Sequence, residues 1–219
     1  MASLLFRAAS FFLLVILFQI LVARVSLQTE TKRRLQHALT GHALVQISYF
    51  LPLAASIILL LLGAFGIYVA QAYALTWFQQ VFGALLREDE LSGKQLPGAF
   101  YFLLGTAFTV FIASDMEIAR YSLECLAIAD PMASFVGSTI PSPKVCPGSS
   151  MSGCIACFGT AWLVGVVMLP MVSQSTLLLG ALACTIAEAS PYGNDNMNIP
   201  LLTAIMVDQF GSGTAVAAL

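Results

Sequence analysis

Charged residues are scarce in this chain: of its 219 residues, 9% are charged and 59% are hydrophobic. A soluble domain carries about 25% charged residues, so this composition falls outside that class. The formal net charge is −2, and the nine basic residues form no extended stripe. This distribution excludes the basic surface expected of a nucleic-acid-binding protein.

The motifs of soluble kinases and hydrolases are also missing. The only Gly-Lys pair, Gly93-Lys94, is followed by Gln95 and lacks the leading glycine of a P-loop. Neither the protein-kinase motifs nor a G-x-S-x-G nucleophile elbow occurs. Cys154 and Cys157 form a lone C-x-x-C without a second pair or a nearby histidine, which disfavours a zinc site.

Long apolar runs dominate what is present, and they approach or exceed the roughly 18 to 20 residues that cross a hydrocarbon core. They predict an all-α fold, a polytopic transmembrane helical bundle of about eight spans, in a single integral membrane domain over residues 1–219. The expected spans lie near residues 3–23, 43–60, 62–85, 98–114, 117–137, 153–170, 174–189 and 198–217.

Two of these boundaries depend on a few residues that end or interrupt an apolar run. The run from Ser3 to Ala23 ends at Arg24 without a small-residue cleavage site, which favours a retained first span over a signal peptide. Residues 43–86 are almost unbroken, and Pro52 with the Gly63/Gly66 pair favours a break near Gly63 over one very long helix.

Eight spans put residues 24–42, 86–97, 138–152 and 190–197 on one face of the membrane. These segments hold seven of the nine basic residues, namely Arg24, Lys32, Arg33, Arg34, Arg87, Lys94 and Lys144. The positive-inside rule makes this face cytoplasmic. Both histidines and the Gly/Pro/Asn-rich loops fall on it too, which favours a functional surface there.

Three acidic residues, Glu124, Asp130 and Glu188, lie within or at the ends of apolar runs. An ionisable group at membrane depth costs about 3 kcal/mol on insertion scales, so it normally faces a bundle interior, a wet cavity or a partner. For Glu124, a solvated position at the interface is an equal alternative.

The pair Asp130-Pro131 predicts an N-cap followed by a first-turn proline, where one helix breaks and the next begins. A restarting helix presents free N–H groups that suit phosphate, and Asp130 beside them suits a magnesium ion. A plain helix kink is the alternative.

Oxygen ligands are dense between Glu188 and Asn196, where Asn194 and Asp195 also lie. These groups suit magnesium, which prefers carboxylates plus substrate phosphates. The same residue types form tight turns, so a simple connector is the alternative.

Two polar clusters precede that segment. The first, Lys32-Arg33-Arg34-Leu-Gln-His37, suits phosphate but is equally expected of a topogenic or lipid-headgroup patch. The second, Gly148-Ser-Ser-Met-Ser-Gly153, offers hydroxyls and backbone amides without a charged lysine.

Four blocks of the chain, taken in order, resemble a known enzyme family. They are Arg33-Arg34-x-x-His37-x-x-x-Gly41; Leu86-Arg87-Glu88 followed by Pro97-Gly98-Ala99-Phe100-Tyr101; Ala127-Ile-Ala-Asp130-Pro131-Met-Ala133-Ser-Phe-Val-Gly137; and Glu188-x-Ser190 with Asp195-Asn196-x-x-x-Pro200. Together they resemble the dolichol kinase, phytol kinase and CTP-dependent diacylglycerol kinase family (the polyprenol kinase family), which is related to phosphatidate cytidylyltransferases. The blocks cover about residues 32–200.

The resemblance implies a CTP-dependent lipid kinase that transfers the γ-phosphoryl group to a lipid alcohol, such as diacylglycerol, phytol or a polyprenol like dolichol. The partners would be CTP, the lipid alcohol and membrane lipids, with Mg²⁺ as cofactor and no nucleic acid. The protein would be integral to the endoplasmic reticulum of a eukaryote or the plasma membrane of a bacterium, with its active face cytoplasmic.

On this hypothesis, phosphoryl transfer asks the protein mainly for positioning and charge neutralisation. The metal ligands would be Asp130, Asp195 and Glu188, and the groups on the nucleotide phosphates would be Arg33, Arg34, Lys144 and Asn196. Either His37 or one of the carboxylates would take the proton of the lipid hydroxyl. Where the family usually has a lysine-serine pair before a glycine, this chain has Ser149-Ser150-Met-Ser-Gly153, so that lysine's role is lost or passes to Lys144.

Two alternatives stay open. Cytidylyl transfer to phosphatidate would use the same nucleotide but release pyrophosphate instead of CDP. A non-enzymatic membrane transporter would also suit broken helices and intramembrane carboxylates, although the chain has no internal repeat.

Overall fold

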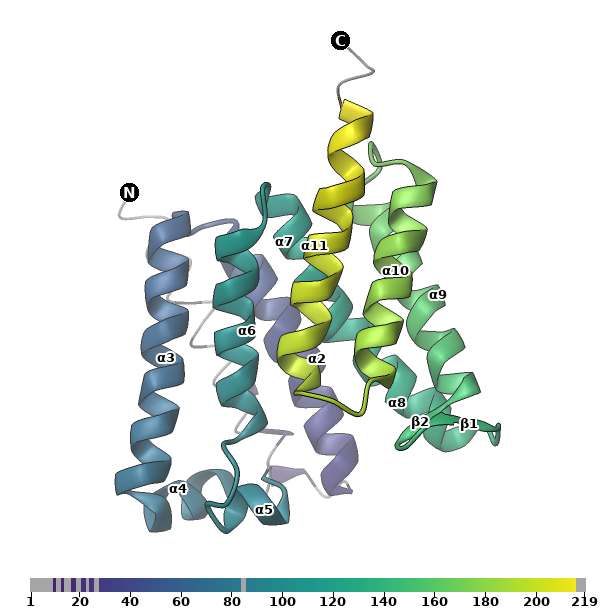
Figure 1. Cartoon of the computed structure of the whole chain (residues 1–219). Helices are drawn as coiled ribbons and strands as arrows, with labels where there is room; N and C mark the ends of the chain where they lie inside the picture. The colour runs from purple at the N-terminus through teal and green to yellow at the C-terminus, as the bar shows by residue number, and fades with distance from the viewer. Residues whose placement is uncertain are drawn as a thin grey trace. The chain divides into compact units, whose positions relative to one another are not determined.

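The computed structural model describes residues 28–83 and 86–215, together with isolated positions between 10 and 25. The expected first span, near residues 3–23, lies outside the described residues apart from those isolated positions. The chain divides into two compact units, Met1–Ala107 and Phe108–Leu219, with the division inside one helix. The described residues are mostly helical, which confirms the all-α prediction (Figure 1).

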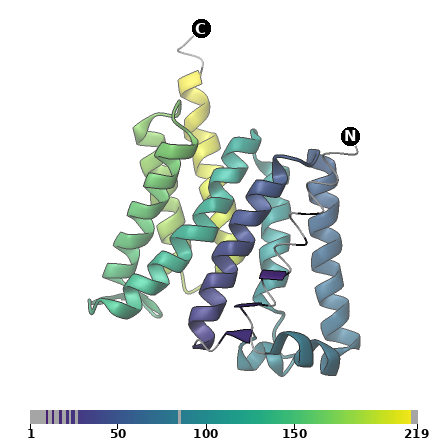
Figure 2. The same ribbon diagram turned by 180° about the vertical axis from the view of Figure 1, so that it is seen from behind.

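Between residues 28 and 107, the described part of unit 1 contains four helices and the start of a fifth. They are α2 (Thr29–Ser48), α3 (Leu53–Tyr73), α4 (Leu75–Phe82), α5 (Glu88–Leu91) and α6 (Gly98–Ile112). Residues 29–42, expected in a loop, are therefore helical. The N-terminal end of α2 lies at the same end of unit 1 as α4 and α5, as Figure 1 and the reverse view in Figure 2 both show.

The predicted break near Gly63 is wrong, because α3 runs through Gly63 and Gly66 without interruption. The chain breaks instead at Pro52, which has no N–H to donate and takes an extended conformation with φ −60° and ψ 147°. Gly63 has a packing role, since a Cβ there would lie 3.0 Å from the Leu103 side chain on α6.

After the end of α6, the described part of unit 2 contains a long helical run, a small hairpin and three further helices. The elements are α7 (Met116–Glu124), the π-helix η2 (Cys125–Ala129), α8 (Asp130–Thr139), β1 (Lys144–Cys146), β2 (Ser149–Ser150), α9 (Met151–Met168), α10 (Gln174–Ala189) and α11 (Asp195–Ala215). The hairpin and the 190–194 loop lie at one end of this unit, and the α9–α10 connection lies at the other (Figure 1).

The core of unit 2 is built around Tyr121, which is fully buried and donates its hydroxyl to the Ala161 carbonyl at 3.3 Å. Two glycines leave room for its ring: a Cβ on Gly165 would lie 3.1 Å from Tyr121, and one on Gly180 would lie 3.2 Å from its hydroxyl. Small residues at these crossings let the helix backbones approach closely.

Two of the described helices, α3 and α9, are long and apolar enough to cross a membrane. The expected eight spans are not supported. The helices α6 and α10 are apolar but have only 15 and 16 residues. The expected 117–137 span is divided among α7, η2 and α8, and its sequence carries four charged residues.

Candidate functional site

Asp130 follows a π-helical turn directly, so α8 continues the helical run of α7 and η2 without a break. The Asp130 N–H donates to the Cys125 carbonyl, five residues back, and its φ of −63° and ψ of −52° are helical. Pro131 explains the wide turn, because its ring cannot sit against the carbonyl four residues earlier and its missing N–H breaks the usual ladder. The predicted N-cap and helix restart at Asp130 are therefore wrong, and so is the free helix N-terminus expected beside it.

Three carboxylates from three helices nevertheless share one neighbourhood in unit 2. Asp130 begins α8, Glu188 lies in the last turn of α10, and Asp195 begins α11. All three are half-buried, and the charges of Asp130 and Asp195 both act on Glu188. The sequence predicted this grouping on one face of the protein.

Glu188 is perturbed by its surroundings. It adjoins the polar 190–194 loop and lies outside both candidate membrane spans. Burial, followed by the charges of Asp130 and Asp195, raises the pKa of Glu188 from 4.5 to about 7. Its Oε2 atom is buried without a hydrogen-bond partner, which is unusual for a carboxylate.

These residues suit a divalent cation without forming a closed cage. No group of three His, Cys, Asp or Glu side chains in the described part of the chain is arranged to hold a metal ion by itself. Magnesium, however, is usually bound by one or two carboxylates plus substrate phosphates. Crowded acidic groups with an unpartnered buried oxygen are the donor set that such an ion would neutralise.

Asp195 does not cap its helix either. Asn194 does so, since its side-chain oxygen accepts from the Asn196 N–H at 3.1 Å. The loop before it turns at Gly193, whose φ is +82°, and the Asn198 side chain donates to the Tyr192 carbonyl at 2.8 Å.

The segment 148–153 is a structural cap. The first N–H groups of α9 already have partners: Met151 donates to the Pro143 carbonyl, Ser152 to the Ser142 hydroxyl and Gly153 to the Ser150 hydroxyl. The expectation that these amides are available for a ligand is therefore wrong. Lys144 is exposed on β1 and pairs in register with Ser150, so a lysine does lie beside this helix start.

The basic cluster of α2 belongs to unit 1. Arg33 forms an ion pair with Glu30 at 3.4 Å, one turn away, and both side chains are substantially exposed. The His37 ring packs edge-on against Phe102, with 5.2 Å between the ring centroids. Arg34 is half-buried on the same helix. Arg33, Arg34 and His37 thus lie together in unit 1, whereas Asp130, Glu188, Asp195, Asn196 and Lys144 lie in unit 2.

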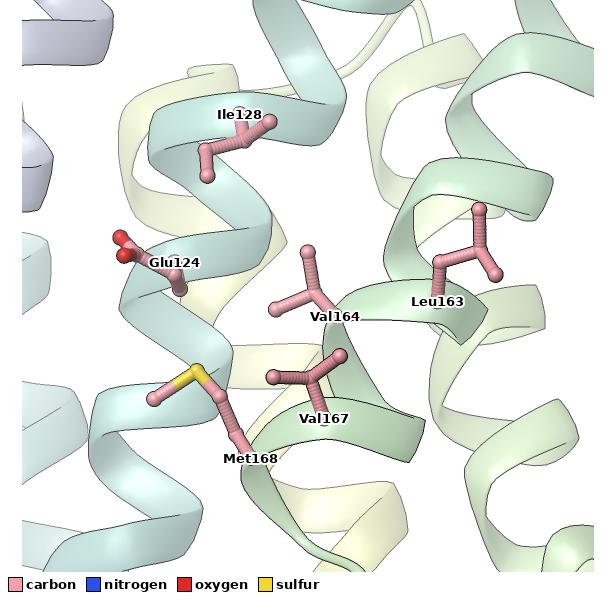
Figure 3. Close-up of a pocket in the computed structure, with 6 residues that line it drawn as sticks. All are labelled: Glu124, Ile128, Leu163, Val164, Val167 and Met168. Carbon is pink, nitrogen blue, oxygen red and sulfur yellow. The ribbon is translucent and has the colours of Figure 1, made fainter.

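Glu124 borders an apolar pocket between the α7–η2 run and α9. The pocket measures about 280 Å³ and is otherwise lined by Ile128, Leu163, Val164, Val167 and Met168 (Figure 3). Figure 3 shows the Glu124 carboxylate turned away from the α9 side chains. Glu124 is 6% exposed, which agrees with an interior position and not with a solvated interfacial one. The pocket suits hydrocarbon better than phosphate.

Two features of these units escaped prediction from the sequence. The thiols of Cys157 on α9 and Cys184 on α10 lie 3.7 Å apart and are fully buried. Glu90 is buried in unit 1, where its carboxylate accepts from the N–H of Arg87 at 2.8 Å and of Gly98 at 2.7 Å. The Arg87-x-x-Glu90 spacing fits a capping box, but the bond to Gly98 has no local signal.

No protein-family model matches this chain, and comparisons with curated proteins and with solved structures give no match either. The family resemblance therefore rests on the four sequence blocks. In unit 2, the third and fourth blocks contain the acidic residues that lie near one another.

Proposed function

We propose that this chain is a CTP-dependent lipid-alcohol kinase. It would transfer the γ-phosphoryl group of CTP to the hydroxyl of diacylglycerol, phytol or a polyprenol such as dolichol at the cytoplasmic face of a membrane. The grouping of Asp130, Glu188 and Asp195 carries the proposal, because a triphosphate needs a cation and the cation needs acidic ligands. The family resemblance of the four blocks supports it.

In this proposal Asp130 and Asp195 would hold Mg²⁺, which when bound would neutralise charge on the triphosphate. Lys144 adds a positive charge toward the phosphates from β1, and Asn196 offers amide hydrogen bonds from the first turn of α11. Arg33, Arg34 and His37 in unit 1 stay predictions from the sequence.

We assign the proton transfer to Glu188, which carries a buried carboxylate oxygen without a hydrogen-bond partner. Burial, the largest cause, holds the pKa of Glu188 above its usual range, which favours a group that takes up a proton. Its unpartnered Oε2 would accept the proton of the lipid hydroxyl as the new oxygen–phosphorus bond forms. The bond from the γ-phosphorus to the bridging oxygen breaks, and CDP leaves.

A product assay tests the proposal. The purified protein in detergent is given CTP and Mg²⁺ with each lipid alcohol in turn, and CDP and lipid phosphate are measured. We expect both products in equal amounts, with ATP a much poorer donor. Release of pyrophosphate with phosphatidate as acceptor would favour cytidylyl transfer, and no turnover of any of these lipids would contradict the kinase.

We place the protein in the endoplasmic reticulum membrane of a eukaryote, or in the plasma membrane of a bacterium. The two helices that can cross a membrane support a membrane location. The finer prediction of about eight spans requires α6, α10 and the other apolar runs to lie in the bilayer as well, which mapping of loop accessibility would test.

A further inference from the structure

Exposed aromatic side chains gather where α3 ends and α4 begins. Tyr68 is 46% exposed, Tyr73 is 84% exposed and Trp77 on α4 is 54% exposed. Large aromatic rings with a polar group are costly to leave in water and are enriched where a membrane's hydrocarbon meets its headgroups.

These rings lie between an apolar segment and a charged one. Along α3 before them, the exposed side chains are entirely aliphatic or Phe from Ile58 to Phe65. After them, α5 and its flanks carry Arg87, Glu88, Asp89 and Lys94, all exposed. The order of apolar, aromatic and charged residues is the order of hydrocarbon, interface and water in a bilayer.

The orientation of α4 fits a position at the interface between hydrocarbon and water. In both ribbon views α4 lies across the end of α3 and does not continue its axis (Figures 1 and 2). Its Phe78 is buried at 4% exposure whereas Trp77 faces out, so the helix is two-sided. Gln79 donates to the Leu91 carbonyl at 2.6 Å and Gln71 to the Gln95 carbonyl at 2.7 Å, which ties α4 and α3 to the charged segment.

Positive charge also lies at this end of unit 1. The first turns of α2, with Lys32, Arg33 and Arg34, are at the same end as α4 and α5 (Figures 1 and 2). Basic residues at this level complement anionic lipid headgroups.

We propose that α4 is an interfacial helix that lies in the headgroup–acyl boundary of a phospholipid bilayer, with Tyr73 and Trp77 as its anchors. The membrane-crossing part of this segment then ends at Tyr73, and residues 86–95 are on the water side. The sequence had placed residues 75–85 inside a span. This inference concerns the position of unit 1 in a bilayer and is independent of the proposed activity.

The chain has only two tryptophans, which makes the depth of Trp77 directly measurable. The Trp162→Phe variant is reconstituted into vesicles of phosphatidylcholine and phosphatidylserine whose acyl chains are brominated either near the headgroup or near the methyl end. We expect a larger loss of Trp77 emission with the shallow bromines. The matched variant Trp77→Phe reports Trp162 alone and shows how much of the wild-type quenching belongs to Trp77.

Two results would overturn the inference. Stronger quenching of Trp77 by the deep bromines would return α4 to a membrane span. No quenching by either lipid would place α4 in water or under another protein. If Trp162→Phe fails to fold, Trp162→Tyr, which keeps a polar ring to bond Gln174, gives the same readout.

Discussion

Gly153 of α9 faces the backbone of Ala133 on α8 with no space for a side chain between them. A Cβ on Gly153 would lie 2.9 Å from the Ala133 carbonyl oxygen and 3.5 Å from the Cα of Gly137. The small residues of the third sequence block therefore bring α8 against the start of α9, and this contact holds Asp130 and the hairpin in one assembly.

Gly153→Ala should lower the stability of the protein. The new methyl group meets a backbone carbonyl that cannot rotate away, so we expect a loss of about 1–3 kcal/mol, as overpacking usually gives. Gly159→Ala on the same helix is the matched control, because nothing lies within 4 Å of a Cβ there. The control should stabilise by up to about 1 kcal/mol from helix propensity. Thermal unfolding in detergent measures both, and equal melting temperatures for the two variants would refute the contact.

Asp130→Asn and Asp195→Asn should each abolish most phosphoryl transfer, with the double variant no worse than either single one. Groups that hold one ion act as a unit, and their effects are not additive. Asp115→Asn is the control, since Asp115 caps α7 by accepting from the Glu117 N–H and asparagine caps equally well. Turnover is measured at saturating Mg²⁺. Near-normal activity in Asp130→Asn would remove this residue from the site.

The stability of the protein should fall as the pH rises through neutrality, because of Glu188. A carboxyl group whose pKa is raised on folding holds its proton more tightly in the folded state. The stabilisation is complete below pH 4.5 and is lost as the pH rises through about 7. Glu188→Gln cannot ionise, so only the wild type should lose stability as the pH rises. The melting temperature of Glu188→Gln minus that of the wild type should therefore increase from pH 5 to pH 8. Parallel melting curves across this range would argue against the raised pKa.

Glu90→Gln should destabilise unit 1. An amide can offer one oxygen to one N–H, but its NH₂ group then faces the second donor, so a buried bond is lost. The expected loss is about 1–3 kcal/mol. The exposed neighbour Glu88→Gln should change stability little. Hydrogen exchange at the Gly98 amide would report the effect locally, and unchanged protection there would contradict it.

The helical class and the grouping of acidic residues could be predicted from the sequence, because both follow from local pattern. Apolar composition predicts helices whatever they pack against, and turn chemistry places Glu188 and Asp195 on either side of one short loop. The proximity of Asp130 to Glu188 does not follow from local pattern. It was predicted only because both residues were assigned to the same face of a helical bundle.

Two incorrect predictions involve prolines, and one missed contact depends on a loop. Asp130-Pro131 has the composition of a helix start, but tertiary packing keeps the chain helical and widens one turn instead. Pro52 ends a helix where the sequence analysis favoured Gly63, since proline removes a donor whereas glycine only weakens a helix. The Glu90 bond to Gly98 depends on the path of a loop, which no periodicity encodes.

The π-turn at Cys125–Ala129 also fixes the direction in which the side chains of α8 point around the helix axis. An α-helix turns about 100° per residue, so one residue absorbed in a wider turn rotates the next helix by roughly that angle. In a continuous α-helix, Asp130, Ala133 and Gly137 would point about a quarter-turn away from their present neighbours on α9 and α10. One proline thus aligns two different surfaces at once: the glycine contact that joins α8 to α9, and the carboxylate that lies near Glu188.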